Sequence, residues 1–393
     1  MNARAGPLDA SVHRAIRAGS GPSASSIDAL VAEHTATLGD DGRARAARGM
    51  LEQLVGLGPL AQLAADRSVT DLLVNGDGVV WVDRGRGVER AALRVEVDDL
   101  RPLAVRLAGV AGRRLDDAQP WVDGVLPGGV RLHAVLPPLA DGGPHLSLRF
   151  ARHRPGGVDT LARLGAATPD MATLLREVVA AGTSLVVTGG TGAGKTTVLA
   201  ALVAECPTDQ RVVVVEDVRE LDPEHPHVVR LQGRGPNVEG VGGVTLVVLV
   251  RQALRMRPDR LVVGEVRGAE VRELLAALNT GHEGGMSTLH ANGPEEVPAR
   301  FEALGALAGM PRDAVHAQLR EALRVVVHVA RRQGSRRVER VGVVGPDPSD
   351  PRVVRVVEAA RSGERGLVAG PGRDRLFRLV PSVANGCRWV GSC

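Results

Sequence analysis

The sequence has few aromatic residues and no tyrosine. Its 393 residues include three Phe and three Trp, so aromatics make up 2% of the chain. Proteins that bind single-stranded nucleic acid stack the bases on aromatic side chains, and this chain offers few of them. Its acidic and basic residues are also interspersed along the sequence. Direct nucleic-acid binding is therefore disfavoured, in spite of a net charge of +4.

Cysteine and long apolar runs are scarce as well. Cys206, Cys387 and Cys393 form neither a CxxC pair nor a spacing typical of metal ligands, so we expect no zinc site. No apolar run approaches the ~18 residues that span a bilayer. The N-terminus also lacks the charged-then-apolar pattern of a signal peptide. These absences predict a cytoplasmic protein with reduced thiols, whose association with a membrane is peripheral.

Lysine is nearly absent. Of the 49 Lys and Arg residues, 48 are Arg and one, Lys195, is Lys. It stands in Gly189-Gly-Thr-Gly-Ala-Gly-Lys-Thr196, which fits the phosphate-loop pattern GxxxxGK[ST]. The apolar stretch before this loop and the helix predicted after it are the context that the motif requires.

This loop predicts a binding site for ATP and Mg²⁺. Its glycines let the backbone N–H groups point at a phosphate beside the positive end of a helix. Lys195 is expected to reach the β- and γ-phosphates, and the Thr196 hydroxyl to bind Mg²⁺. The predicted nucleotide-binding residues of this segment are Gly189, Gly190, Thr191, Gly192, Ala193, Gly194, Lys195, Thr196 and Thr197.

Length and patterning predict two domains with short appendages. Residues 1–45 are interpreted as an N-terminal helical extension and residues 46–150 as a smaller α+β domain. A linker rich in Arg and Gly follows at 151–160. Strands are predicted in the first domain at Val69–Asn75, Val79–Asp83, Val130–Val135 and Leu146–Phe150, with a helix at Asp98–Ala111.

From 161 to 345 the pattern alternates between strand and helix, which is typical of an α/β fold with a parallel sheet covered on both faces. Beyond 345 the Pro, Gly and Arg content rises, and we expect a C-terminal tail of uncertain order. Strands are predicted at Ser184–Thr188, Arg211–Glu216, Leu261–Gly264, Met286–His290, Val325–Ala330 and Arg337–Val344, and helices at about 195–204, 245–256, 268–279, 294–308 and 312–324.

Acidic residues close two of the predicted strands. Glu265 follows one of them, and the pair Glu216-Asp217 follows another. Ligands collect at the carboxyl ends of the strands in such sheets, so Glu265 is expected to hold the Mg²⁺ shell. Either Glu216 or Glu265 would orient or deprotonate the attacking water, and the spacing does not choose between them.

Two histidines stand at the strand predicted at Met286–His290, since His282 precedes this strand and His290 ends it. On a strand beside the phosphate loop they could sense the γ-phosphate. No third ligand is spaced for a metal ion, which disfavours a metal site at these histidines.

Together these motifs resemble the type II/IV secretion-system ATPase superfamily, and most closely its Tad/CpaF-type pilus assembly branch. The resemblance covers roughly residues 50–345. Besides the phosphate loop it includes Ser68-Val-Thr-Asp-Leu-Leu-Val-Asn-Gly76, Gly112-Arg-Arg-Leu-Asp116, Leu136-Pro-Pro138, Glu216-Asp-Val-Arg-Glu-Leu221, Leu254-Arg-Met-Arg-Pro-Asp-Arg260, Gly264-Glu-Val-Arg-Gly268, and Gly281-His through His290-Ala-Asn292.

The resemblance implies a RecA-like P-loop NTPase domain and gives roles to individual residues. It makes Glu265 the Walker B acid. The Asp box would be Glu216, Asp217 and Glu220, and the His box His282 and His290. Arg113, Arg131 and Arg149 match positions from which the N-terminal domain approaches the phosphates, and Arg230 and Arg234 are candidates to act from a neighbouring subunit. An Arg delivered in this way is worth roughly 10³–10⁵ in rate.

The implied function is that of a ring-forming, hexameric ATPase. ATP hydrolysis would power Tad-type (Flp) pilus assembly or protein secretion across the bacterial inner membrane, at whose inner face the ring meets a polytopic platform protein. One alternative is a type IV secretion or conjugation ATPase of the same fold. Another is a non-hydrolysing scaffold that changes shape when nucleotide binds.

Overall fold

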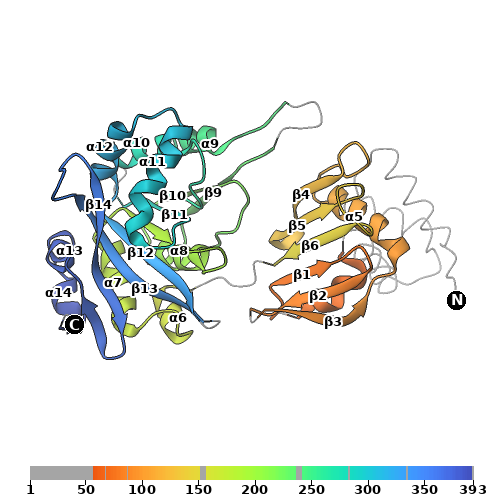
Figure 1. Ribbon diagram of the computed structural model, residues 1–393, viewed down its shortest axis with the longest axis horizontal. Helices are drawn as coiled ribbons and strands as arrows, with labels where there is room; N and C mark the ends of the chain where they lie inside the picture. The colour runs from red at the N-terminus through yellow and green to blue at the C-terminus, as the bar shows by residue number, and fades with distance from the viewer. Residues whose placement is uncertain are drawn as a thin grey trace. The chain divides into compact units, whose positions relative to one another are not determined.

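The computed structural model describes residues 56–66, 68–85, 87–150, 156–235, 241–281, 284–332 and 335–391. The chain divides into two compact units, Met1–Arg152 and His153–Cys393 (Figure 1). The predicted N-terminal extension, 1–45, lies outside the described residues, as does the first half of the predicted linker. Within the described ranges, no helix combines the length and apolar character needed to cross a membrane.

The first unit is built on an antiparallel sheet with the strand order β3-β2-β1-β6-β5-β4. Alternate residues of the central strands are buried, and helix α5 packs its Leu100, Leu103 and Leu107 against them. The elements are 3₁₀ helix Gly58–Leu60, α4 Ala61–Ala65, β1 Asp71–Val74, β2 Val79–Asp83, β3 Val88–Arg94, α5 Val97–Val110, β4 Trp121–Leu126, 3₁₀ helix Pro127–Gly129, β5 Val130–Val135 and β6 His145–Arg149.

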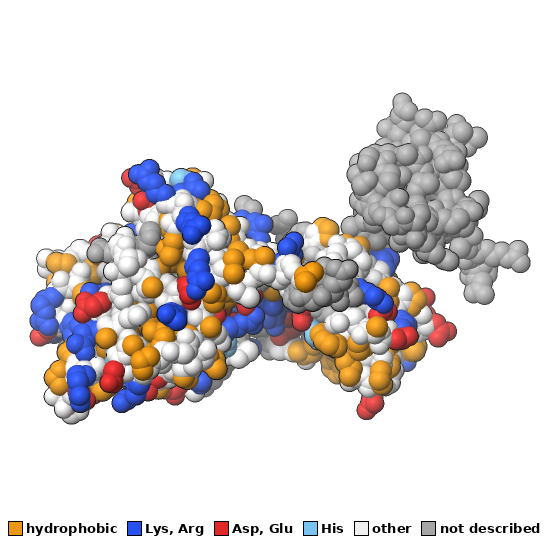
Figure 2. Space-filling model, turned by 90° about the horizontal axis from the view of Figure 1, so that it is seen from above, with side chains coloured by type: hydrophobic (Ala, Val, Ile, Leu, Met, Phe, Trp, Pro, Cys, Tyr) orange, Lys and Arg blue, Asp and Glu red, His pale blue; other side chains and the backbone are white. Residues whose placement is uncertain are grey.

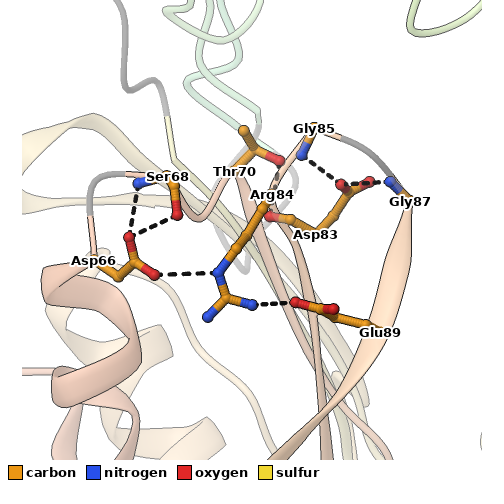
Figure 3. A network of polar contacts seen from close by, with 8 residues as sticks. All are labelled: Asp66, Ser68, Thr70, Asp83, Arg84, Gly85, Gly87 and Glu89. Atoms are coloured by element: carbon orange, nitrogen blue, oxygen red, sulfur yellow. Dashed lines mark hydrogen bonds and ion pairs between the residues drawn. The ribbon is translucent and has the colours of Figure 1, made fainter. Parts of the chain in front are cut away.

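A polar network ties the end of α4 to the β2–β3 hairpin (Figure 3). Arg84 donates from Nε to Asp66 Oδ2 at 3.1 Å and forms a second ion pair with Glu89. Asp66 also accepts hydrogen bonds from the backbone N–H and the hydroxyl of Ser68, at 2.9 and 2.7 Å. These bonds lower the pKa of Asp66 to about 2. The network therefore keeps its charge over the ordinary range of pH.

The second unit has a sheet with the order β16-β15-β14-β13-β12-β7-β11-β10-β8-β9. The strands from β12 to β9 in this list are parallel. β7, β8, β10 and β11 are buried at every position, which explains their unbroken apolar runs. The parallel strands are β7 Leu185–Thr188, β8 Val212–Glu216, β9 Val228–Gln232, β10 Arg260–Val263, β11 Met286–Leu289 and β12 Val325–Arg332.

Helices cover both faces of this sheet (Figure 1). On one face lie α6 Val158–Arg163, α7 Pro169–Ala180 and α8 Lys195–Ala204. On the other lie α9 Leu246–Leu254, α10 Val271–Leu278, α11 Val297–Leu307, preceded by the 3₁₀ helix Pro294–Glu296, and α12 Arg312–Ala322. Buried Leu, Val and Ala side chains make up most of what these helices contribute to the two apolar cores, so many small side chains fill the space that few aromatic residues occupy.

The uncertain order expected beyond residue 345 is wrong for the residues described there, up to 391. Most of the Pro and Gly lie in the turns or at the ends of elements, whereas the segments between them pair and pack. Val354 and Val356 alternate with exposed residues on a strand that pairs antiparallel with β13, and Leu376 and Val383 join the core of α7. The added elements are β13 Ser335–Pro346, β14 Val354–Gly363, β15 Gly366–Ala369, α13 Arg373–Leu379, α14 Val383–Gly386 and β16 Trp389–Val390.

Candidate active site

The phosphate loop joins β7 to α8 at the carboxyl edge of the parallel strands. Gly194 caps α8 with a left-handed φ of +100°, which favours glycine. A Cβ atom on Gly189 would lie 2.3 Å from the carbonyl oxygen of Val329, so no larger residue fits there. The loop is thus held between its own helix and the neighbouring strand β12, with its N–H groups at the helix N-terminus.

Lys195 is buried, with 7% of its surface exposed. Its Nζ donates to the carbonyl oxygens of Gly189 and Gly190, each at 3.1 Å, and lies 3.3 Å from both ring nitrogens of His290. Burial lowers the pKa of Lys195, and the charges of Glu265 and Glu220 act in the opposite direction. The ammonium is therefore held inside the loop by carbonyl oxygens, and a phosphate would compete with them for it.

His290 connects Lys195 to Glu265. Glu265 follows β10 and His290 follows β11, so both lie just beyond the carboxyl ends of neighbouring parallel strands. His290 Nε2 lies 2.9 Å from Glu265 Oε1. Lys195, His290 and Glu265 therefore form one chain of polar contacts that starts inside the phosphate loop.

Glu216, the last residue of β8, is the buried carboxylate of the site, with 5% of its surface exposed. Its Oε1 accepts the backbone N–H groups of Glu220 at 3.0 Å and Leu221 at 2.9 Å. Burial raises the pKa of Glu216 to about 7, although these two hydrogen bonds lower it. Glu220 in turn faces the loop, since the Thr196 hydroxyl lies 3.4 Å from its Oε2. The segment after β8 is thus folded against both Glu216 and the phosphate loop.

The sequence that forms this arrangement matches a known protein family. The family described as type II/IV secretion system protein matches residues 53–365, which is most of the chain. The chain belongs to this family.

Curated relatives agree with this assignment. The chain is 55% identical over 305 residues to the putative conjugal transfer protein Rv3659c of Mycobacterium tuberculosis, covering 76% of this chain and 87% of that protein. It is 32% identical over 301 residues to the type IV secretion system protein PtlH of Bordetella pertussis, covering 69% and 88%. The fold is also that of the Legionella pneumophila ATPase DotB, with a TM-score of 0.50 and 18% identity over 83% of this chain and 85% of that one. The RecA-like α/β fold expected from the sequence is therefore confirmed.

Three residues implied by the resemblance to the family have partners within their own chain. Asp217 forms an ion pair with Arg267. Arg230, on β9, forms an ion pair with Asp222, and its positive charge lowers the pKa of Glu216. Arg234 donates from Nε to the carbonyl oxygen of Gly242 at 2.9 Å. His282 lies outside the described residues, and action of Arg230 or Arg234 on a neighbouring subunit stays a prediction.

The three arginines of the N-terminal unit lie on two adjacent strands and one helix end. Arg131 on β5 and Arg149 on β6 are directly opposite each other in the sheet. Arg149 donates from Nε to Asp71 Oδ1 at 2.9 Å, and Arg113 follows the end of α5. Their approach to a bound nucleotide stays a prediction.

The structure adds residues that the sequence did not single out. Thr288 on β11 donates from its hydroxyl to the carbonyl oxygen of Gly264 at 2.6 Å, which fixes the backbone next to Glu265. Thr188 Oγ1 lies 3.1 Å from Nδ1 of the buried His328 on β12. A threonine at the end of an otherwise apolar strand, directly before the phosphate loop, is the signal that could have found Thr188, whereas Thr288 stands beside Ser287 on β11 and has no such signal.

Gly264 offers a direct test of whether the placement of Glu216 matters. A Cβ atom there would lie 2.6 Å from Cγ of Glu216, and the backbone is one that alanine accepts. We expect Gly264→Ala to displace the carboxylate, lowering the rate of ATP hydrolysis roughly tenfold and the free energy of unfolding by about 1–3 kcal/mol. Gly386→Ala, with its nearest neighbour at 3.9 Å, is the matched control. Equal rates for the two variants would contradict a role for the position of Glu216.

Proposed function

We propose that this secretion-system protein is an ATPase that works as a hexameric ring. The observation that carries the proposal is the set of polar groups around the phosphate loop. Lys195 contacts His290, His290 contacts Glu265, and Glu216 and Glu220 close the neighbouring side. A loop that only bound nucleotide would not need two acids and a histidine at the ends of neighbouring strands.

The residues fit ATP with Mg²⁺. Mg²⁺ prefers hard oxygen ligands, and the Thr196 hydroxyl together with the carboxylates of Glu220 and Glu265 provides them beside Lys195. When bound, the ion would neutralise charge on the phosphate oxygens. Thr196 and Glu265 would hold it, as the sequence predicts.

The chain's own residues account for the remaining chemistry. Lys195 would exchange the carbonyl oxygens of Gly189 and Gly190 for phosphate oxygens, because an ammonium is attracted more strongly to an anionic oxygen than to a neutral carbonyl oxygen. His290 contacts Lys195 and also pairs with Glu265, so it would couple the movement of the Lys195 ammonium to the position of Glu265. Glu216 has a pKa near neutrality, which suits a group that takes a proton from water.

The cargo of the motor is a finer proposal. The sequence motifs favour Tad-type pilus assembly or protein secretion, driven through a polytopic platform protein of the inner membrane. The names of the relatives, a putative conjugal transfer protein and a type IV secretion protein, support conjugation or type IV secretion instead. Deletion of the gene distinguishes these, because loss of surface pili supports the first and loss of DNA transfer between cells the second.

The test of the ATPase proposal is phosphate release by the purified full-length chain. We expect hydrolysis by the wild type and a fall of about 10²–10³-fold in Glu265→Gln. With ATP and Mg²⁺ we expect a native mass near six times the 41.1 kDa of one chain. Binding of ATP with equally slow phosphate release by wild type and variant would favour the non-hydrolysing scaffold.

A further inference from the structure

The β12–β13 hairpin passes beside the phosphate loop on the side of α8. A Cβ atom on Gly194 would lie 3.4 Å from Cδ of Arg336, which stands near the start of β13. The close approach of Gly189 to the carbonyl oxygen of Val329 on β12 places the same hairpin at the other end of the loop. Two independent close approaches therefore place the hairpin against the loop, and the guanidinium of Arg336 is bonded to an atom that lies beside Gly194.

A second arginine faces the same way. Arg331 on β12 and Arg336 on β13 are directly opposite each other in the antiparallel register, so their side chains share one face of the sheet. That face also carries Val329 and Val338, which pack in the core beneath α8. Arg337, one position further along, belongs to the opposite face, because side chains alternate along a strand.

Neither Arg331 nor Arg336 has a side-chain hydrogen bond or ion pair within the described part of the chain, and both are exposed. Nearby basic residues of the same hairpin do have acidic partners: Arg332 pairs with Glu339, and Arg340 with Glu295. Like charges directly opposite each other destabilise a sheet. An anion bound between the hairpin and the loop would remove that repulsion, and the phosphate loop is a site built to hold one.

We propose that Arg336 binds the phosphate groups of the nucleotide from within the same subunit, and that Arg331 adds a second positive charge beside it. The inference rests on the proposed function and adds a binding contribution that does not depend on a neighbouring subunit. Arg336 supplies a planar cation whose geometry suits phosphate oxygens, on the flank of the loop away from the strand ends that carry Glu216 and Glu265.

Calorimetric titration of the full-length chain tests this proposal, with ADP and inorganic tripolyphosphate as the probes. Losing a charge-assisted hydrogen bond to phosphate weakens binding about tenfold or more. We expect Arg336→Gln to lose about tenfold in affinity for both probes and Arg331→Gln to lose less. Arg337→Gln removes the same charge from the opposite face of the same hairpin and is expected to bind as the wild type does. A thermal unfolding curve like that of the wild type shows that each variant folds.

The outcomes separate this proposal from the proposed function. Equal affinity of Arg336→Gln and Arg337→Gln, while Lys195→Ala loses binding, would overturn the role of Arg336 alone. Weaker ADP binding by Arg336→Gln with unchanged tripolyphosphate binding would also overturn it, because the contact would then be with the nucleoside. A folded wild type that binds neither probe would overturn both proposals.

Discussion

Lys195→Ala is expected to lower the rate of ATP hydrolysis about 10²–10³-fold and to weaken ATP binding by at least about tenfold. Lys195 is buried in the loop and holds its ammonium against the carbonyl oxygens of Gly189 and Gly190. Without a phosphate-binding cation at that point, the loop retains its N–H groups but loses the charge that offsets the phosphates. Phosphate release and calorimetric binding measure the two effects.

Lys195→Arg is the matched control for charge. Arginine keeps the positive charge but brings a larger planar group to a buried site formed by the carbonyl oxygens of Gly189 and Gly190 and the ring of His290. We expect it to fail nearly as completely as the alanine variant, since the buried position sets the size of the group. A Lys195→Arg variant with wild-type activity would show that the charge alone is needed.

The rarity of lysine gives a chemical version of the same test. Apart from the N-terminal amine, Lys195 carries the one amine of the chain that an acylating reagent can modify. Burial lowers its pKa, which favours the reactive neutral form. We expect acetylation of Lys195, followed by mass spectrometry, to be suppressed by ATP and unaffected by an equal concentration of adenosine. Equal labelling with and without ATP would mean that the nucleotide does not cover this amine.

Much of the second unit could be predicted because its signals are local. A run such as Val212–Glu216 has buried residues at every position. The loop after β7 has the GxxxxGK[ST] pattern, which is specific to phosphate loops. The predicted strand ends therefore placed Glu216 and Glu265 on one edge. Which residues lie next to them on that edge depends on the strand order β7-β11-β10-β8. This order arises from the folding of the whole chain and cannot be deduced from the spacing of the motifs along the sequence.

The elements missed by sequence analysis have weaker signals. β9 is half-buried along most of its length, so its residues lack the apolar run that marked the other strands. Helix α7 begins at Pro169 after Thr168, whose hydroxyl accepts the N–H of Met171, and a threonine followed by proline is a local capping signal for a helix start. The segment beyond 345 has an irregular sequence pattern because its Pro and Gly lie mostly in turns and at the ends of short elements. Its strands are stabilised by pairing with β13 rather than by local preference.

The partners of individual side chains were the least predictable feature of the site. His290 was expected near the loop, but its simultaneous contact with Lys195 and Glu265 depends on the ends of three strands meeting. Arg336 gave no signal among the 49 basic residues of the sequence. Basic side chains are also interspersed with acidic and apolar ones over the face shown in Figure 2, so surface charge alone does not single it out.

Glu216 is expected to set the pH dependence of hydrolysis. Its pKa of about 7 arises from burial and is raised further by Glu220 and lowered by Arg230. If Glu216 takes the proton from water, the rate should rise as pH passes through about 7, and Glu216→Gln should be slower by about 10²–10⁴-fold without that rise. Glu265→Gln is the matched comparison, and we expect it to be slower but to retain the rise. A flat profile in Glu265→Gln would transfer the role to Glu265.

The same ionisation should appear in stability. An unfolded Glu216 titrates near its ordinary pKa of 4.5, and the folded one near 7. Between these values the folded protein holds the extra proton, so the free energy of unfolding falls as pH rises. The fall is absent below 4.5 and complete above about 7, where it amounts to about 3 kcal/mol. Glu216→Gln has no such proton, and its amide oxygen can still accept the N–H groups of Glu220 and Leu221.

Denaturant unfolding of the nucleotide-free protein therefore complements the kinetic experiment. We expect Glu216→Gln to gain about 3 kcal/mol over the wild type between about pH 4.5 and pH 8.5. A difference that does not change with pH would contradict the raised pKa. If the difference grows as expected while the rate profile of Glu216→Gln keeps its rise, Glu216 serves as a buried anchor for the segment after β8. The proton of the attacking water must then go to Glu265, which already shares a contact with His290.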